Sequence, residues 1–292
     1  MRGLGMASAL LISAGCGGAA LAADMNTNTD MKPDMARKAD MAVKAQPAPI
    51  SSWTGLYGGV NGGGAFGNST GTLSTFTTAP GSDFTGAVNA GGTPRNLGAK
   101  HNGGFGGAQV GYNWQTGDWV FGVETDIQGA DIGNTSTTNF GGAAANAQGI
   151  RTAPSVSTGR DHIDWFGTLR GRAGLTVDQV LFFGTAGLAY GGVQSSATNI
   201  FTPAAAGVFT GITNDTRVGW AAGAGVEWGF APGWSVKGEY LHVDLGSSNV
   251  TIVDPVHFPR ASATYRFNHA FDTIRIGVNY RFNWAIPTIA ID

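Results

Sequence analysis

The chain has 292 residues, and its 17 Lys and Arg and 19 Asp and Glu side chains make up only 12% of it, against roughly 25% in an ordinary soluble domain. The 48 glycines follow no Gly-X-Y repeat, which excludes collagen. The net charge of −2, without a run of basic residues, excludes a nucleic-acid-binding protein.

The N-terminus is typical of a secreted protein. Residues 1–22 combine the positive Arg2, an apolar stretch and a small-residue site at Ala20-Leu21-Ala22, which predicts a cleaved signal peptide. The single cysteine, Cys16, lies inside it, so the mature chain is expected to have no disulfides. Residues 23–52 mix charges with prolines and predict a disordered periplasmic linker.

From residue 53 onward the hydrophobic pattern has a period of two. Between Trp119 and Gly129 the apolar side chains alternate with Glu124 and Asp126, which is typical of a strand with one apolar face. A soluble β-sandwich also alternates, but most of these segments reach the roughly 9 to 11 residues of a tilted membrane strand. The eight predicted strands are 53–64, 105–115, 119–129, 165–173, 180–193, 218–230, 234–240 and 274–282.

The connections between the predicted strands alternate in length. Three are short turns, near residues 116–118, 176–179 and 231–233, and four are long runs rich in Gly, Ser, Thr and Asn. This alternation is the plan of an outer-membrane barrel with both termini in the periplasm. The sequence therefore predicts an all-β fold over residues 53–282: an eight-stranded antiparallel up-and-down transmembrane β-barrel with four long external loops, followed by a C-terminal extension, 283–292.

Aromatic side chains gather at the ends of the predicted strands, where their amphipathic rings suit the membrane interface. The residues predicted to lie there are Trp53, Trp114, Trp119, Trp165, Trp220, Trp228, Trp234, Tyr280 and Phe282; Trp284 belongs to the same end.

The residues that alternate with the apolar ones along these strands carry charges of both signs. An eight-stranded barrel is just wide enough for side chains to fill it, so these residues predict an interior ion-pair network that plugs the lumen. Its predicted members are Glu124, Asp126, Arg170, Arg172, Arg217, Glu227, Lys237, Glu239, Arg275 and Arg281. A narrow pore, with long side chains swung aside, is the alternative.

Motifs for catalysis or for a cofactor are weak. Glu124 and Asp126 have a spacing compatible with acid–base chemistry, but basic partners are available for both. The stretch 67–71 matches the G-x-S-x-G motif without the strand–turn–helix context that it needs. The five histidines, His101, His162, His242, His257 and His269, are expected to be solvated in loops, with a haem or metal site built from separate loops as the alternative. We expect no enzymatic activity, no metal and no cofactor.

Several stretches together resemble a known family. They are Trp53-Thr54-Gly55-Leu56-Tyr57-Gly58-Gly59, Gly107-Ala108-Gln109-Val110-Gly111-Tyr112-Asn113-Trp114, Trp165-Phe166-Gly167-Thr168-Leu169-Arg170-Gly171-Arg172, Val236-Lys237-Gly238-Glu239-Tyr240-Leu241 and Ile274-Arg275-Ile276-Gly277-Val278-Asn279-Tyr280-Arg281-Phe282. The chain resembles the small outer-membrane surface-antigen barrels of alphaproteobacteria, often described as immunogenic or porin-like. The resemblance implies a monomeric barrel in the outer membrane of a Gram-negative cell, and some relatives are described as haemin binders. One departure is that ten residues follow Phe282, whereas such barrels commonly end on an aromatic.

The sequence thus predicts a structural barrel protein of the outer membrane that supports the envelope and presents surface loops. Its expected partners are outer-membrane lipid and lipopolysaccharide, peptidoglycan through the linker, and host or environmental surfaces, but not nucleic acid. The alternatives are a narrow porin-like channel for ions or small solutes and a haem-binding surface receptor.

Overall fold

The computed structural model describes residues 52–78, 84–142, 153–202 and 207–282. The predicted signal peptide, nearly all of the linker, and the extension 283–292 with Trp284 lie outside the described residues. Within the described ranges, no helix is long and apolar enough to cross a membrane. The helix α2 (Thr85–Asn89) has five residues.

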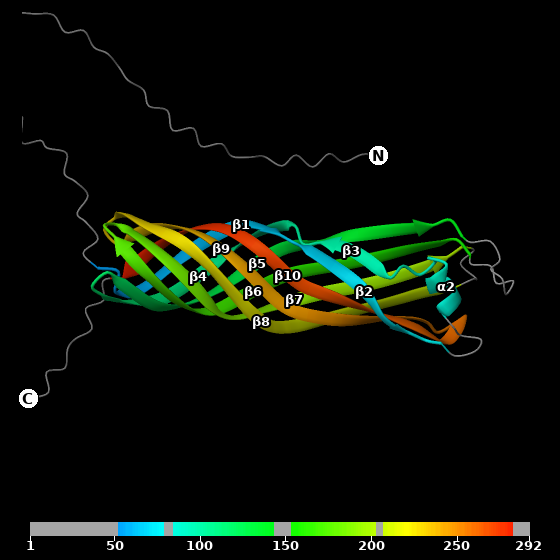
Figure 1. Cartoon of the computed structure of the whole chain (residues 1–292). Helices are drawn as coiled ribbons and strands as arrows, with labels where there is room; N and C mark the ends of the chain where they lie inside the picture. Colours follow the sequence, from blue (N-terminus) through cyan, green and yellow to red (C-terminus); the bar gives the residue numbers. More distant parts are fainter. Residues whose placement is uncertain (1–51, 79–83, 143–152, 203–206, 283–292) are drawn as a thin grey trace, which may run out of the picture. The chain divides into compact units, whose positions relative to one another are not determined.

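Eight of the described strands form a closed antiparallel ring, in which each strand pairs with the next along the chain and β10 pairs back with β1. Figure 1 shows these strands side by side around the barrel. They are β1 (Gly55–Phe66), β4 (Gly103–Thr116), β5 (Trp119–Phe140), β6 (Ser155–Val177), β7 (Val180–Phe201), β8 (Val208–Ala231), β9 (Trp234–Asp254) and β10 (Phe258–Phe282). The predicted eight-stranded barrel is confirmed.

A further hairpin continues the wall at one end of the barrel. Strand β2 (Asn68–Phe76) follows β1 along the edge of β10 and pairs with β3 (Asn96–Lys100). Figure 1 places β2, β3 and α2 together at this end. Leu97 of β3 is 1% exposed and packs with Val88 of α2, so the hairpin and the helix share one apolar cluster.

The three tight connections lie at the other end of the barrel. Each has a residue with positive φ: Gly117 at 61°, Asp178 at 53° and Gly233 at 78°. In the first two turns the positive φ is at the first central residue, as in the primed turns that match the twist of the strands. In the third, Pro232 fixes its own φ at about −65°, so the positive φ falls on Gly233 instead. The structure therefore places all three predicted turns at one end, which is the periplasmic end in barrels of this plan.

The strands are much longer than the sequence pattern indicates. Strand β6 has 23 residues, whereas a tilted strand crosses the membrane with about 9 to 11. On β5 the outward side chains as far as Ile127 are apolar except for Thr125, and they become polar from Asp131 onward. Most of the sequence expected as long loops between β5 and β10 is therefore strand that extends the barrel beyond the outward apolar band, on the side opposite the tight turns.

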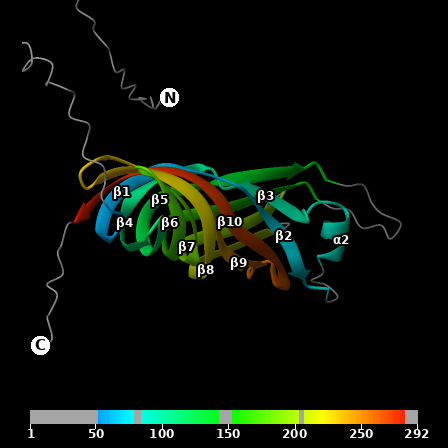
Figure 2. The ribbon, with the colours of Figure 1, turned by 60° about the vertical axis from the view of Figure 1, so that its left-hand side comes forward.

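The lumen is packed in layers, and β7 and β9 pass through them in turn. From the tight-turn end, β7 contributes Leu181 and Phe183 to a small apolar cluster and then Thr185 to a charged layer. β9 supplies Lys237 and Glu239 to that charged layer, followed by apolar residues up to Leu245, the polar Ser248, and apolar residues again. Figure 2 shows how the strands curve around this interior.

Candidate functional site

The charged layer arises from strand alternation and register. Side chains two residues apart on a strand point to the same side, and the pairing places opposite charges directly across from each other. Glu124 of β5 is opposite Arg170 of β6, Glu227 of β8 is opposite Lys237 of β9, and Glu239 of β9 is opposite Arg275 of β10. Opposite charges at such positions stabilise neighbouring strands. We name the ion-pair layer by its charged members: Glu124, Asp126, Arg170, Arg172, Glu227, Lys237, Glu239 and Arg275.

Arg170 lies at the centre of the ion-pair layer. Its Nη2 donates to Glu124 Oε1 at 2.6 Å and to Asp126 Oδ2 at 3.0 Å, and its Nη1 donates to Glu239 Oε1 at 2.5 Å. Because Glu239 lies on β9 and Glu124 on β5, this one guanidinium connects opposite walls of the barrel. Arg275 Nε donates to Glu239 Oε2 at 2.6 Å, and its Nη1 donates to Asp126 Oδ2 at 3.0 Å.

The remaining charges complete a neutral set. Lys237 Nζ lies 2.9 and 2.8 Å from the two carboxylate oxygens of Glu124, and Arg172 Nη2 lies 2.8 Å from Glu227 Oε2. Four carboxylates thus face four cationic groups, and every member of the layer is at most 5% exposed. Buried charges are tolerated when they are paired and hydrogen-bonded in this way.

Neutral residues that sequence reasoning missed add further hydrogen bonds to the layer. Tyr57 donates its hydroxyl proton to Glu124 Oε2 at 2.8 Å and accepts from Arg172 Nη1 at 3.1 Å. Ser235 donates to Glu227 Oε1 at 2.6 Å. The inward position of Tyr57 could have been read from the sequence, because it lies four residues before Asn61 and therefore on the same inward-facing side of β1.

Two of the ten residues predicted for this network lie outside it. Arg217 is in the part of β8 between Thr210 and Trp220, where the pairing with β9 is interrupted, and it contacts Asp215 instead, at 3.0 Å. Arg281 is at the tight-turn end, where its guanidinium lies over the ring of Trp53 at 5.7 Å. Both residues are on the inward-facing side of their strands, as predicted. They lie too far along the barrel axis from the ion-pair layer to reach its carboxylates.

Seven of the nine predicted interface aromatics are on the outside of the barrel: Trp114, Trp119, Trp220, Trp228, Trp234, Tyr280 and Phe282 are between 39% and 51% exposed. Their depth in the membrane stays a prediction. Trp53 is a correction, because it is 3% exposed and packs inside with Val120, Leu181 and Phe183. Trp53 lies just before β1 and four residues before Tyr57, so it shares the inward-facing side of that residue. Trp165 is half-buried, and its ring contacts Tyr190.

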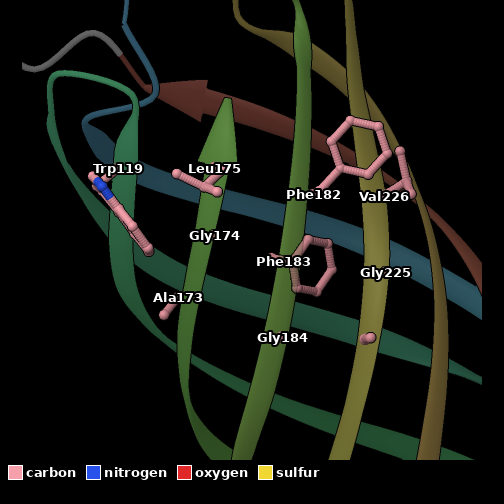
Figure 3. A pocket seen from close by; sticks show the side chains of 10 residues that line it. Trp119, Ala173, Gly174, Leu175, Phe182, Phe183, Gly184, Gly225 and Val226 are labelled. Carbon is pink, nitrogen blue, oxygen red and sulfur yellow. The ribbon is translucent and has the colours of Figure 1, made fainter. Parts of the chain in front are cut away.

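The outer surface is hollowed near the tight-turn end. A pocket of about 620 Å³ lies where small residues, including Ala173 and Gly184, separate Trp119 from Val226. Figure 3 shows Trp119, Leu175, Phe182 and Val226 around this hollow. Since these side chains belong to the outward apolar band, the pocket faces lipid.

A second polar layer lies between the two larger apolar clusters. His101, from the short link between β3 and β4, has its Nε2 2.7 Å from Asp161 Oδ2, and His269 of β10 has its Nδ1 3.0 Å from the same oxygen. All three side chains are completely buried. Ser195 donates to Asp161 Oδ1 at 2.8 Å, and Ser248 lies 2.9 Å from His269 Nε2. We name these five residues the histidine layer.

The histidine layer corrects the expectation that its two histidines are solvated, and its hydrogen bonds keep the Asp161 carboxyl group ionised. His101 and His269 were expected to be solvated, but the long strands and the β2–β3 hairpin enclose them. Burial acts to raise the pKa of Asp161, but hydrogen bonds from His101 and His269 outweigh it and hold that pKa well below its usual value. Asp161 is therefore an ionised carboxylate in a sealed interior.

Comparison with solved structures finds other outer-membrane proteins. The chain is similar to the outer membrane protease OmpT from Escherichia coli, with 10% identity and a TM-score of 0.42 over 78% of this chain and 97% of that one. It is also similar to the outer membrane protein OprG from Pseudomonas aeruginosa, with 12% identity and a TM-score of 0.40 over 79% and 97%.

Sequence comparison is more specific. Residues 39–282 match the model of the outer membrane protein beta-barrel domain. The 31 kDa outer-membrane immunogenic protein of Brucella melitensis is 34% identical over 260 residues, which are 88% of this chain and 95% of that protein. The 22 kDa outer membrane protein of Rhizobium leguminosarum is 32% identical over 153 residues, 51% of this chain and 57% of that protein. The chain therefore belongs to the outer membrane protein β-barrel family, in the outer membrane of Gram-negative bacteria.

Proposed function

We infer that the chain is a closed, non-enzymatic structural barrel that supports the integrity of the outer membrane and presents its extended strands at the cell surface. The observation that carries this proposal is the packing of the lumen. The ion-pair layer and the histidine layer alternate with three buried apolar clusters along the axis. An ion crossing this interior would have to displace paired charges and then pass through apolar packing, which favours a closed barrel over a channel.

The contacts of the two candidate catalytic carboxylates support a structural role. Glu124 and Asp126 both accept hydrogen bonds from Arg170 in a layer without solvent access, so neither is free to act on a substrate. The motif at residues 67–71 begins between β1 and β2 and continues along β2, so it has no following helix to form a nucleophile elbow.

The partners that we propose follow from the surfaces. The apolar band and the exposed aromatics suit acyl chains and their interface, with lipopolysaccharide outside. The polar extensions of β5 to β10 would meet host or environmental surfaces. Contact with peptidoglycan through residues 23–52 stays a proposal about a segment outside the described residues.

A deletion strain tests the envelope role. If the barrel supports the membrane, the strain should admit more of a hydrophobic dye such as N-phenylnaphthylamine, and a plasmid copy of the chain should restore the barrier. Uptake of small hydrophilic solutes should be the same in both strains. Slower solute uptake with unchanged dye entry would show a channel and overturn the proposal.

Surface presentation is tested by labelling single cysteines on whole cells. Thr138 of β5 is exposed on the extension, and Asp118 is exposed in a tight turn. A membrane-impermeant maleimide should label Thr138→Cys on intact cells, and should label Asp118→Cys only after the outer membrane is permeabilised. The reverse pattern would invert the orientation and refute the proposed presentation.

A further inference from the structure

Three potential metal ligands converge in the histidine layer from distant parts of the chain. A ring nitrogen of His101, a ring nitrogen of His269 and a carboxylate oxygen of Asp161 lie within 4.8 Å of one another, and all three residues are buried. We propose that these side chains bind one divalent transition-metal ion, with Zn²⁺ the best match, as a structural site that fixes the β3–β4 connection to β6 and β10.

The ring nitrogens that face Asp161 are the ones that a metal ion would use. His101 Nε2 and His269 Nδ1 lie 2.7 and 3.0 Å from Asp161 Oδ2. At these positions each nitrogen either carries a proton that the carboxylate accepts or ligates a metal ion together with it. Metal binding therefore replaces the protons between the two rings and the carboxylate, and it leaves Asp161 facing a cation.

The donor set and its surroundings suit zinc. Two imidazoles and one carboxylate are frequent Zn²⁺ ligands, and metal–ligand lengths of about 2.0–2.1 Å separate neighbouring donors by roughly 3.3 Å in a tetrahedron. The distances of 2.7 and 3.0 Å to Asp161 Oδ2 therefore need to widen by about 0.3 to 0.6 Å, and the ring nitrogens, which lie within 4.8 Å of each other, need to approach to a similar spacing. The other nitrogen of each ring already has a partner, Ala270 for His101 and Ser248 for His269, which is the usual support of a ligating histidine.

The strands are irregular where they build this layer. On β6 the inward residues are odd-numbered up to Ile163 and even-numbered from Phe166, and the pairing with β7 shifts between them. A second shift, at Gly246 of β9 with φ of 78°, turns Ser248 inward, where its hydroxyl lies 2.9 Å from His269 Nε2. Bulges re-aim side chains and are frequent beside functional sites. Without the β6 bulge, Asp161 would point outward.

The site is sealed on both sides by apolar packing. Phe271 and Ile163 lie in the apolar cluster on the membrane side, and Phe267 and Val250 lie in the cluster on the outer side. A buried ion would therefore be acquired during folding and retained afterwards, which is the behaviour of a structural site rather than of a catalytic one.

Metal analysis of the refolded protein tests the proposal. The full chain is refolded from urea into detergent with Zn²⁺, washed with chelator and checked by its mobility on a gel before and after boiling. We expect about one Zn²⁺ per folded chain after the wash. Refolding with Co²⁺ should give the visible absorption of a four-coordinate site.

Matched histidine variants make the result specific. His101→Gln and His269→Gln should each lower Zn²⁺ affinity at least about tenfold, whereas His257→Gln, which removes an exposed histidine beside Asp254, should leave it unchanged. Equal retention in all three variants, or none in the wild type, would overturn the proposal.

If the two ligand variants do not fold, X-ray absorption of the zinc-loaded wild type decides. Two imidazoles and one oxygen in the first shell support the site, and any shell with fewer than two imidazoles refutes it.

Discussion

Replacing Arg275 by Met removes one charge from the ion-pair layer while keeping much of the side-chain volume. Breaking a buried ion pair from one side costs about 3–5 kcal/mol, because the partner charge stays buried. The two carboxylates that accept hydrogen bonds from Arg275, Glu239 and Asp126, keep a hydrogen bond from Arg170 at 2.5 and 3.0 Å. Glu124, which lies 3.7 Å from Arg275 Nη2, also keeps its hydrogen bond from Arg170. The cost should therefore be near the lower limit, about 3 kcal/mol in the free energy of unfolding.

Urea unfolding in lipid vesicles, followed by tryptophan fluorescence, measures this loss. The matched control is Arg266→Met, on the exposed side of the same strand, which should change stability by no more than about 0.5 kcal/mol. Combining Arg275→Met with Glu239→Gln should cost less than the sum of the two changes, by about 1–3 kcal/mol. An Arg275→Met barrel as stable as the wild type would refute the reasoning.

Three further changes test other parts of the structure. A Cβ on Gly107 would lie 1.9 Å from a backbone oxygen of β5, so Gly107→Ala should cost about 1–3 kcal/mol in urea unfolding, whereas Gly238→Ala, with open space around it, should be tolerated. Val123→Arg places a charge in the middle of the outward apolar band and should cost about 2–4 kcal/mol in the same assay. Backbone N–H groups, first that of His257, lower the pKa of Asp254 from 3.8 to about 2. The carboxylate therefore stabilises the fold above about pH 4, and this contribution is lost as the pH falls through about 2. In acid unfolding, the stability difference between the wild type and Asp254→Ala should be largest near pH 6 and should shrink as the pH falls from about 4 to below about 2.

The membrane part of the barrel could be predicted because lipid and packed lumen impose opposite demands on alternate residues. Between Trp119 and Ile127 every outward residue but Thr125 is large and apolar, and the charges point inward. This contrast disappears farther along β5, where consecutive residues of both parities, such as Asn134 and Thr135, are polar and exposed. Residues 134–139 are all polar and so look like a loop, although the backbone pairs as a strand as far as Phe140.

The histidine layer could not be predicted for a related reason. Asp161 is 60 residues from His101 and 108 from His269, so no local spacing connects the three. If the alternation that places Arg170 inward is continued along β6, it predicts that Asp161 points outward. The bulge near Asp164 reverses this direction, and it is not visible in the sequence pattern. By contrast, Glu124 and Arg170 lie on unbroken alternation and could be assigned to the lumen directly.

Conductance across a planar lipid bilayer tests most directly whether the layered lumen is closed. The purified chain is refolded, shown to be folded by its heat-dependent gel mobility, and inserted at increasing concentration with a known porin as the positive control. A barrel closed by the ion-pair layer and its apolar neighbours should give no stepwise currents. Regular, uniform conductance steps that scale with inserted wild-type protein would contradict the closed lumen and with it the proposed structural role.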